Sequence, residues 1–200
     1  MTPRAVLWDA DGVLQELPPF SELWPSLDRD VRRRVLAATI GSDEDGVLTG
    51  RVDMRQLVDS ALRTEGLDDH RGEFLGVWED FPPVVEAREL LARVRAAGTT
   101  CVLASNQDSL RAAHMRPLYE PLLDRLYLSP EIGLAKPDGA FFRHIADDLG
   151  HAPDALVFVD DNEANVAGAR AVGLHAIHWH FTHGIETLRT ALGSAGVPLR

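Results

Sequence analysis

Three short apolar runs in this chain end directly in polar side chains, and this pattern constrains the fold more than any other feature. The runs cover residues 6–8, 100–104 and 155–159, and the polar residues after them are Asp9 and Asp11, Ser105 and Asn106, and Asp160 and Asp161. Helical periodicity separates the runs, and strands that alternate with helices form a parallel sheet with helices on both faces. The sequence therefore predicts an α/β fold whose ligands bind where the strands end.

The spacing of apolar residues gives approximate bounds for these elements. Strands are expected over residues 5–9, 100–104, 125–128, 155–159 and 174–179. Helices are expected over residues 84–97, 108–115, 138–149, 163–172 and 184–192. Gly98, Gly150 and Gly173 follow three of these helices, as expected for a residue that readily ends a helix.

Residues 14–81 interrupt this alternation and show helical spacing throughout. Three helices are expected, indicated by Phe20, Leu23, Trp24, Leu27 and Val31, then by Met54, Leu57, Val58, Ala61 and Leu62, and last by Phe74, Leu75, Val77 and Trp78. Asp53 is a suitable N-cap for the second helix, and the polar residues 41–46 indicate a turn. The sequence thus predicts a core of residues 1–13 and 82–200 and a small α-helical cap inserted at residues 14–81.

Asp9 and Asp11 lie two residues apart at the end of the first expected strand. Residues at positions i and i+2 of a strand share a face, so both carboxylates can point into one site. Two like charges this close are costly unless a cation neutralises them or a reaction uses them. A calcium loop of the EF-hand type needs Glu at the twelfth position, which here is Phe20. A catalytic and metal-binding turn remains, with an ordinary surface turn as its alternative.

Four segments in order resemble the four motifs of the haloacid dehalogenase-like hydrolase superfamily. They are Asp9-Ala10-Asp11-Gly12-Val13, Ser105-Asn106, Lys136-Pro137 and Asp160-Asp161. Their order and spacing match over nearly the whole chain, and this implies a Rossmann-like parallel sheet with an inserted cap. Thr49-Gly50-Arg51, Glu131-Ile132-Gly133 and residues 160–166 further resemble the branch that contains small sugar-phosphate phosphatases and the phosphatase domain of soluble epoxide hydrolase.

The resemblance implies a magnesium-dependent phosphohydrolase that cleaves a small phosphate monoester. Asp9 would be the nucleophile that forms an aspartyl-phosphate, and it would bind Mg²⁺ together with the backbone carbonyl of Asp11. Asp11 would protonate the leaving oxygen and then deprotonate the water that cleaves the intermediate. The dehalogenase branch lacks this second aspartate, so Asp11 favours a phosphatase over a dehalogenase.

The other motif residues receive roles from the same resemblance. Ser105 and Asn106 are neutral donors that would orient phosphoryl oxygens, and Lys136 would offset charge on Asp9 and the phosphate. Asp161 would coordinate the metal directly, while Asp160 would act through water or orient its neighbours. Alternatives are a sugar phosphomutase, a 2-haloacid dehalogenase, and a non-enzymatic switch that is phosphorylated on aspartate.

Charge and composition narrow the class of partner. The net charge of −11, from 20 basic and 31 acidic residues, argues against nucleic-acid binding, which needs a basic surface. No run approaches the roughly 20 apolar residues of a membrane span, and the first residues lack the apolar segment of a signal peptide. Cys101 is the single cysteine, so no internal disulfide forms. We expect a cytoplasmic protein that acts on a small phosphorylated metabolite, and its oligomeric state is left open.

Four histidines form a dense cluster near the C-terminus. His175, His178, His180 and His183 fall within nine residues. No cysteine or acidic pattern typical of a structural zinc site accompanies them. We therefore assign no metal to this cluster, and its role stays open.

Overall fold

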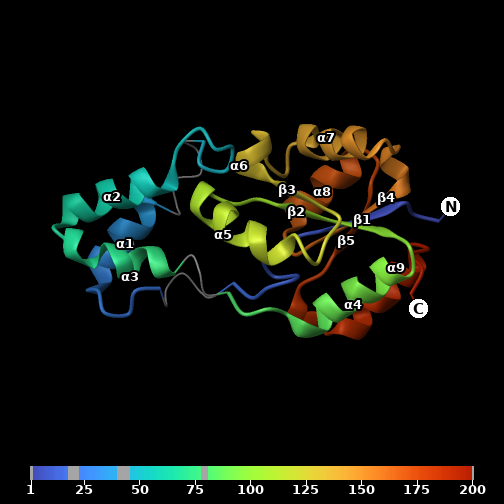
Figure 1. Cartoon of the computed structure of the whole chain (residues 1–200), viewed down its shortest axis with the longest axis horizontal. Helices are drawn as coiled ribbons and strands as arrows, with labels where there is room; N and C mark the ends of the chain where they lie inside the picture. The colour runs from blue at the N-terminus through green and yellow to red at the C-terminus, as the bar shows by residue number, and fades with distance from the viewer. Residues whose placement is uncertain (1, 18–22, 40–45, 78–80, 200) are drawn as a thin grey trace.

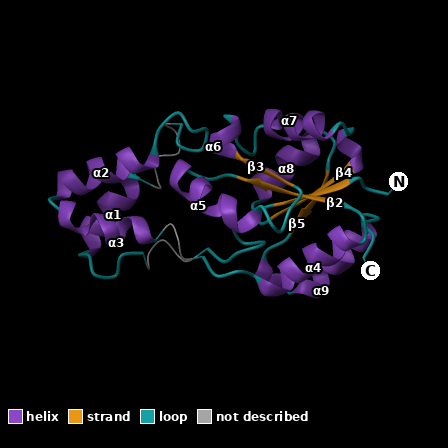
Figure 2. Cartoon of the chain, in the orientation of Figure 1, coloured by secondary structure: helices purple, strands orange, loops and turns teal. Residues whose placement is uncertain are grey.

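The structure is a computed structural model that describes residues 2–17, 23–39, 46–77 and 81–199. Within these residues a five-stranded sheet has the order β3-β2-β1-β4-β5 (Figures 1 and 2). The strands are β1 (Ala5–Trp8), β2 (Thr100–Ser105), β3 (Arg125–Leu128), β4 (Leu156–Asp160) and β5 (His175–His178). Neighbouring strands run parallel in every pair, which confirms the α/β fold expected from the sequence.

Helices cover both faces of the sheet, so its central strands are buried on both sides. One face packs against α4 (Val85–Ala96), α5 (Ser109–Tyr119) and α9 (Ile185–Ser194), and the other against α7 (Gly139–Leu149) and α8 (Glu163–Ala171). In β1, Val6 and Trp8 belong to the first core, whereas Ala5 and Leu7 belong to the second. Burial on both faces explains why these strands are continuous apolar runs.

Short elements link the main ones. α6 (Ser129–Ile132) follows β3 directly and leads into the loop that carries Lys136. Single turns of 3₁₀ helix are η3 (Asp68–His70), η4 (Pro153–Ala155) and η5 (Phe181–His183). Among the described residues, none of the helices is both long and apolar enough to span a membrane.

A separate apolar core lies among three helices at the end of the molecule remote from the sheet (Figure 1). They are α1 (Arg29–Ala38), α2 (Met54–Glu65) and α3 (Arg71–Gly76). The rings of Trp24 and Phe74 stack there with centroids 4.4 Å apart. Asp53 caps α2 as expected, because its carboxylate accepts a hydrogen bond from the backbone of Arg55 at 2.8 Å. These helices confirm an inserted helical cap, and its exact boundaries at residues 14 and 81 stay a prediction.

The first cap helix differs from its sequence prediction. Apolar spacing from Phe20 to Val31 suggested one helix, but α1 begins only at Arg29, where Asp28 caps it. Trp24 has a φ of 51°, which a right-handed helix does not allow, and Pro25 follows it. The repeated apolar residues therefore reflect contacts with the cap core rather than one continuous helix. Phe20, Trp78 and most of the expected turn at residues 41–46 lie outside the described residues.

Candidate active site

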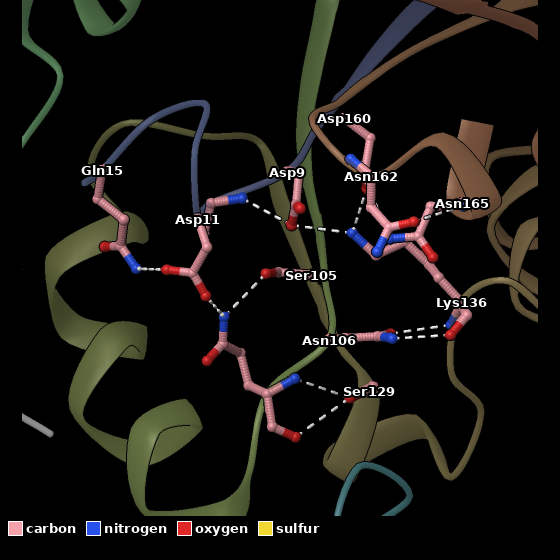
Figure 3. A network of polar contacts seen from close by, with 12 residues as sticks. Asp9, Asp11, Gln15, Ser105, Asn106, Ser129, Lys136, Asp160, Asn162 and Asn165 are labelled. Carbon is pink, nitrogen blue, oxygen red and sulfur yellow. Dashed lines mark hydrogen bonds and ion pairs between the residues drawn. The ribbon is translucent and has the colours of Figure 1, made fainter. Parts of the chain in front are cut away.

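The polar residues predicted from the strand ends meet at the carboxyl edge of the sheet (Figure 3). Asp9 directly follows β1, while Ser105 and Asp160 are the last residues of β2 and β4. β1 pairs with both β2 and β4, so the three side chains leave neighbouring strands. Parallel strand order therefore brings together residues that are up to 151 positions apart in the sequence.

Lys136 forms the centre of this site. Its Nζ lies 2.9 Å from Oδ1 of Asp9 and 2.6 Å from Oδ2 of Asp160. The lysine side chain is 1% exposed, and the carboxylates are 8% and 0% exposed. Burial lowers the pKa of Lys136, but Asp9 and Asp160 outweigh that effect and raise it above the usual value, so the ammonium stays charged.

The described part of the site holds more negative than positive charge. Carboxylate oxygens of Asp9, Asp160 and Asp161 lie within 4.8 Å of one another, with the Lys136 ammonium in contact with two of them. Burial raises the pKa of Asp9 to about 8 although Lys136 opposes the shift. Burial and then Asp160 raise the pKa of Asp161. Three carboxylates and one ammonium fit a divalent cation, and an all-oxygen set suits Mg²⁺.

Asp160 is held by residues from the loop after β4 and from the start of α8. Nδ2 of Asn165 lies 3.1 and 3.2 Å from its two oxygens, and the backbone N–H of Asn162 donates to Oδ1 at 2.8 Å. These contacts and Lys136 leave Asp160 suited to orienting the site. Asp161 faces the loop after β1, because a Cβ on Gly12 would meet its carboxylate at 2.5 Å. Gly12 also has a φ of 71°, so glycine is required there on two grounds.

The two neutral donors at the end of β2 contact protein groups in this structure. The Asn106 amide donates to the carbonyl of Lys136 and accepts from its backbone N–H, both at 2.8 Å. Asn106 therefore fixes the loop that presents Lys136. The hydroxyl of Ser105 accepts from Nε2 of Gln107 at 3.0 Å. Direct contact of Ser105 and Asn106 with a phosphoryl group stays a prediction.

The Lys136 loop also packs against α8 at a glycine. A Cβ on Gly168 would collide with the carbonyl oxygen of Pro137, whereas a Cβ on Gly72 in α3 would meet open space. We expect Gly168→Ala to lower the free energy of unfolding by about 1–3 kcal/mol, because backbone must move to admit the methyl group. Gly72→Ala should raise it by about 0.5–1 kcal/mol, since alanine is the better helix former. Urea unfolding of both variants checks this, and equal stabilities would contradict the close packing of α8 against the Lys136 loop.

Asp11 points to the other side of Asp9 and has partners that sequence reasoning missed. Gln15 and Arg111 donate to its Oδ1 at 2.9 and 2.6 Å, and Gln107 donates to its Oδ2 at 2.9 Å. Phe81 covers the guanidinium of Arg111, whose Cζ is 3.1 Å from the ring centroid. Burial lowers the pKa of Arg111, and Asp11 only partly opposes that shift. Gln107 follows Ser105 by two residues, so on an extended chain the two side chains share a face. This spacing was the one signal in the sequence that could have placed Gln107 in the site.

Two members of the histidine cluster, His178 and His180, lie near Asp161 at the edge of the site. Nε2 of His178 lies 2.8 Å from the backbone carbonyl oxygen of Asp161. His180 lies close enough to Asp161 to oppose the rise of its pKa, and it also contacts Thr182 within η5. The contact between His178 and Asp161 joins β5 to the loop after β4.

Comparisons with known proteins agree with this geometry. A sequence model of the family described as haloacid dehalogenase-like hydrolase matches residues 3–173. Phosphatase MT3486 of Mycobacterium tuberculosis is 26% identical over 197 residues, which cover 88% of this chain and 87% of that protein. (S)-2-haloacid dehalogenase 4A of Burkholderia cepacia is 27% identical over 134 residues, which cover 62% of this chain and 58% of that protein. The chain spans less than two thirds of the length of the first curated relatives that it matches.

Solved structures share the fold. A haloacid dehalogenase family enzyme of Bacteroides thetaiotaomicron, solved as a magnesium complex, superposes with a TM-score of 0.75 at 20% sequence identity. The superposition covers 94% of this chain and 99% of that chain. The similarity therefore includes the helical insertion as well as the sheet.

Proposed function

The chain belongs to the haloacid dehalogenase-like hydrolase family, and we propose that it is a magnesium-dependent phosphohydrolase that cleaves a small phosphate monoester through an aspartyl-phosphate intermediate. The presence of Asp11 two residues after Asp9, with Lys136 in contact with Asp9, is the observation that carries the proposal. A phosphate monoester is a dianion, so it approaches a carboxylate only where positive charge is supplied. Bound Mg²⁺ would supply that charge together with Lys136, held by Asp9, Asp161 and the backbone carbonyl of Asp11, with Asp160 orienting the set.

The hydrogen bonds of Asp9 favour one of its oxygens as the nucleophile. Oδ1 accepts from the backbone N–H of Ala10 at 2.8 Å and from Lys136 at 2.9 Å. No described residue donates to Oδ2. Oδ2 is therefore the oxygen available to attack phosphorus, forming the Asp9–phosphate bond as the ester P–O bond breaks.

Asp11 accounts for the protons of both steps. In the first, its carboxyl group gives a proton to the leaving oxygen, which departs as an alcohol. In the second, its carboxylate takes a proton from the water that attacks the aspartyl-phosphate. The products are inorganic phosphate and free Asp9, and the proton returns to Asp11.

Dehalogenation is the second candidate because a 2-haloacid dehalogenase is among the relatives. Carbon–halogen cleavage by an aspartate needs no proton for its leaving group, since halide leaves as an anion. Asp11 would then have no leaving group to protonate. Three side chains hold the Asp11 carboxylate in place. This supports phosphate-ester hydrolysis, the reaction in which Asp11 protonates the leaving group.

A metal-dependence assay is the direct test. We expect release of inorganic phosphate from an aryl phosphate in the presence of Mg²⁺ and none with excess chelator, because the uncompensated carboxylates repel a dianionic substrate. Sugar phosphates, nucleotides and a 2-chloroacid are assayed in parallel. Chloride release without phosphate release would establish a dehalogenase instead. Phosphoryl transfer to another sugar hydroxyl would establish a mutase, and a stable phosphoprotein without turnover would establish a switch.

The class of partner and the location of the protein are also proposed from composition. A net charge of −11 favours a small phosphorylated metabolite over a nucleic acid as partner. We propose a cytoplasmic location because the chain has a single cysteine and disulfides are rare in that compartment.

A further inference from the structure

Arg111 has more hydrogen-bond donors than the protein gives it acceptors. A guanidinium carries five N–H groups, and among the described residues Asp11 is the single acceptor, 2.6 Å from Nη2. Nε of Arg111 is buried and has no hydrogen-bond partner. The side chain is 7% exposed, so water cannot fully solvate it.

Asp11, in contrast, accepts hydrogen bonds from more side chains than are needed to hold its carboxylate in place. Gln15 reaches its Oδ1 and Gln107 reaches its Oδ2, each at 2.9 Å. These two amides bind both oxygens and hold the carboxylate without Arg111. Gln15 is itself fixed by the hydroxyl of Tyr119 at 2.8 Å. Asp11 is the anion that pairs with the charge of Arg111, but its contact uses Nη2 alone, and Nε stays buried without an acceptor, which is costly.

The place of Arg111 indicates which part of a substrate it faces. Under the proposed function, Asp11 contacts the leaving-group oxygen. Nη2 of Arg111 then lies at most two hydrogen-bond lengths, about 5–6 Å, from a leaving-group oxygen bound at Oδ1 of Asp11. Lys136 and Asp11 lie to either side of Asp9 in Figure 3. Under the same function, Lys136 would lie on the phosphoryl side because it contacts Asp9, and Arg111 would lie on the leaving-group side because it contacts Asp11.

We propose that Arg111 is a specificity-determining residue that binds a carboxylate on the leaving group, so that the substrates are phosphorylated small carboxylic acids. This inference rests on the proposed phosphohydrolase function and names its substrate class. The planar guanidinium fork matches the two oxygens of a carboxylate. A carboxylate one or two carbons from the ester oxygen spans the distance from Asp11 to Arg111. Phe81 stacks on the guanidinium and fixes the plane in which a carboxylate would bind.

A matched pair of substrates tests this inference. Phosphoglycolate carries a carboxylate next to the ester carbon, and 2-hydroxyethyl phosphate has a neutral hydroxyl in its place. We expect the wild-type protein with Mg²⁺ to cleave phosphoglycolate with a kcat/KM about 10- to 100-fold higher than that for 2-hydroxyethyl phosphate. A difference of this size is typical of charge-assisted hydrogen bonds. Arg111→Met should reduce that ratio to about one, and Arg111→Lys should restore part of it, since a charge remains without the fork.

Arg116→Met is the control because it removes a charge from the same helix. Arg116 contacts Glu120 and Glu131, away from Asp11, so the substrate ratio should stay at its wild-type value. The ratio is compared only among variants whose circular dichroism matches the wild type. A wild-type ratio near one, or an Arg111→Met ratio equal to that of the wild type, would overturn the inference. Cleavage of an aryl phosphate, together with equal kcat/KM for phosphoglycolate and 2-hydroxyethyl phosphate, would overturn this inference and leave the phosphohydrolase proposal intact. No phosphate release from any compound would overturn both.

Discussion

Asp9→Asn is expected to lower kcat for phosphate release by about 10⁴-fold or more, because an amide cannot form the aspartyl-phosphate. The change is nearly isosteric, and Oδ1 of Asn can still accept from Ala10 and Lys136, which lie 2.8 and 2.9 Å from the present Oδ1. The fold should therefore survive. Phosphate release from an aryl phosphate with Mg²⁺ measures the effect. Asp28→Asn is the control, since Asn also caps a helix and Asp28 lies at the start of α1. Activity within tenfold of wild type would exclude Asp9 as the nucleophile.

The same variant is expected to stabilise the metal-free protein. Burial raises the pKa of Asp9 from 3.8 to about 8, so between these values the folded protein binds a proton that the unfolded chain does not. The contribution of this group to the free energy of unfolding is therefore greatest below pH 4 and falls as the pH rises toward 8. Asn does not titrate, so its advantage over Asp should grow from pH 5 to pH 8 in chelator. Urea unfolding across that range checks the trend, and an advantage that shrinks would contradict it.

Lys136→Met is expected to have the second large effect, on stability as well as on activity. It leaves Asp9 and Asp160 buried without their shared ammonium, which contacts them at 2.9 and 2.6 Å. Removal of one partner from a buried ion pair costs about 3–5 kcal/mol. We expect a loss of that size at pH 8 in chelator by urea unfolding, together with loss of phosphate release. Arg34→Met removes a cation whose side chain is 52% exposed, so its loss of stability should be much smaller, because water screens an exposed ion pair.

The variant Lys136→Arg tests whether a positive charge at this position is sufficient for stability and activity. Lys136 is the single lysine of a chain with 20 basic residues, so all the other basic side chains are arginines. The Lys136 side chain is 1% exposed and its ammonium contacts two carboxylates, a position that suits a compact charge and not a planar fork. We therefore expect Lys136→Arg to restore neither stability nor activity fully. Wild-type behaviour of this variant would show that the site needs only a positive charge.

Sequence reasoning located the acidic and basic centre of the site because each part has a local signal. Asp9 and Asp160 come at the ends of apolar strand runs, and the carboxyl ends of parallel strands share an edge. Lys136 has no such periodic signal, and only its place between recognised motifs selected it. The assigned roles of these residues remain predictions for the variants above to test.

Other parts of the site had no local signal. Arg111 and Gln107 reach Asp11 across 100 and 96 residues of sequence, so their contacts depend on how α5 packs beside the loop after β1. The Asn106 amide was expected at the substrate, but in this structure it contacts the backbone of Lys136. A side chain at the end of a strand has several polar groups within reach, and the packing of the next loop determines which one it meets.

The sequence by itself determined the parallel sheet, the helices around it and the edge at which the acidic residues gather. Those features depend on periodicity over a few residues and on strand ends, which each segment carries in its own sequence. Only the tertiary structure decided where α1 begins, which donors surround Asp11 and that Arg111 keeps a donor unpaired. Trp24 leaves the helical conformation to stack on Phe74, and Arg111 is buried under Phe81. Each of these outcomes depends on contacts between segments far apart in the chain, where packing outweighs local preference.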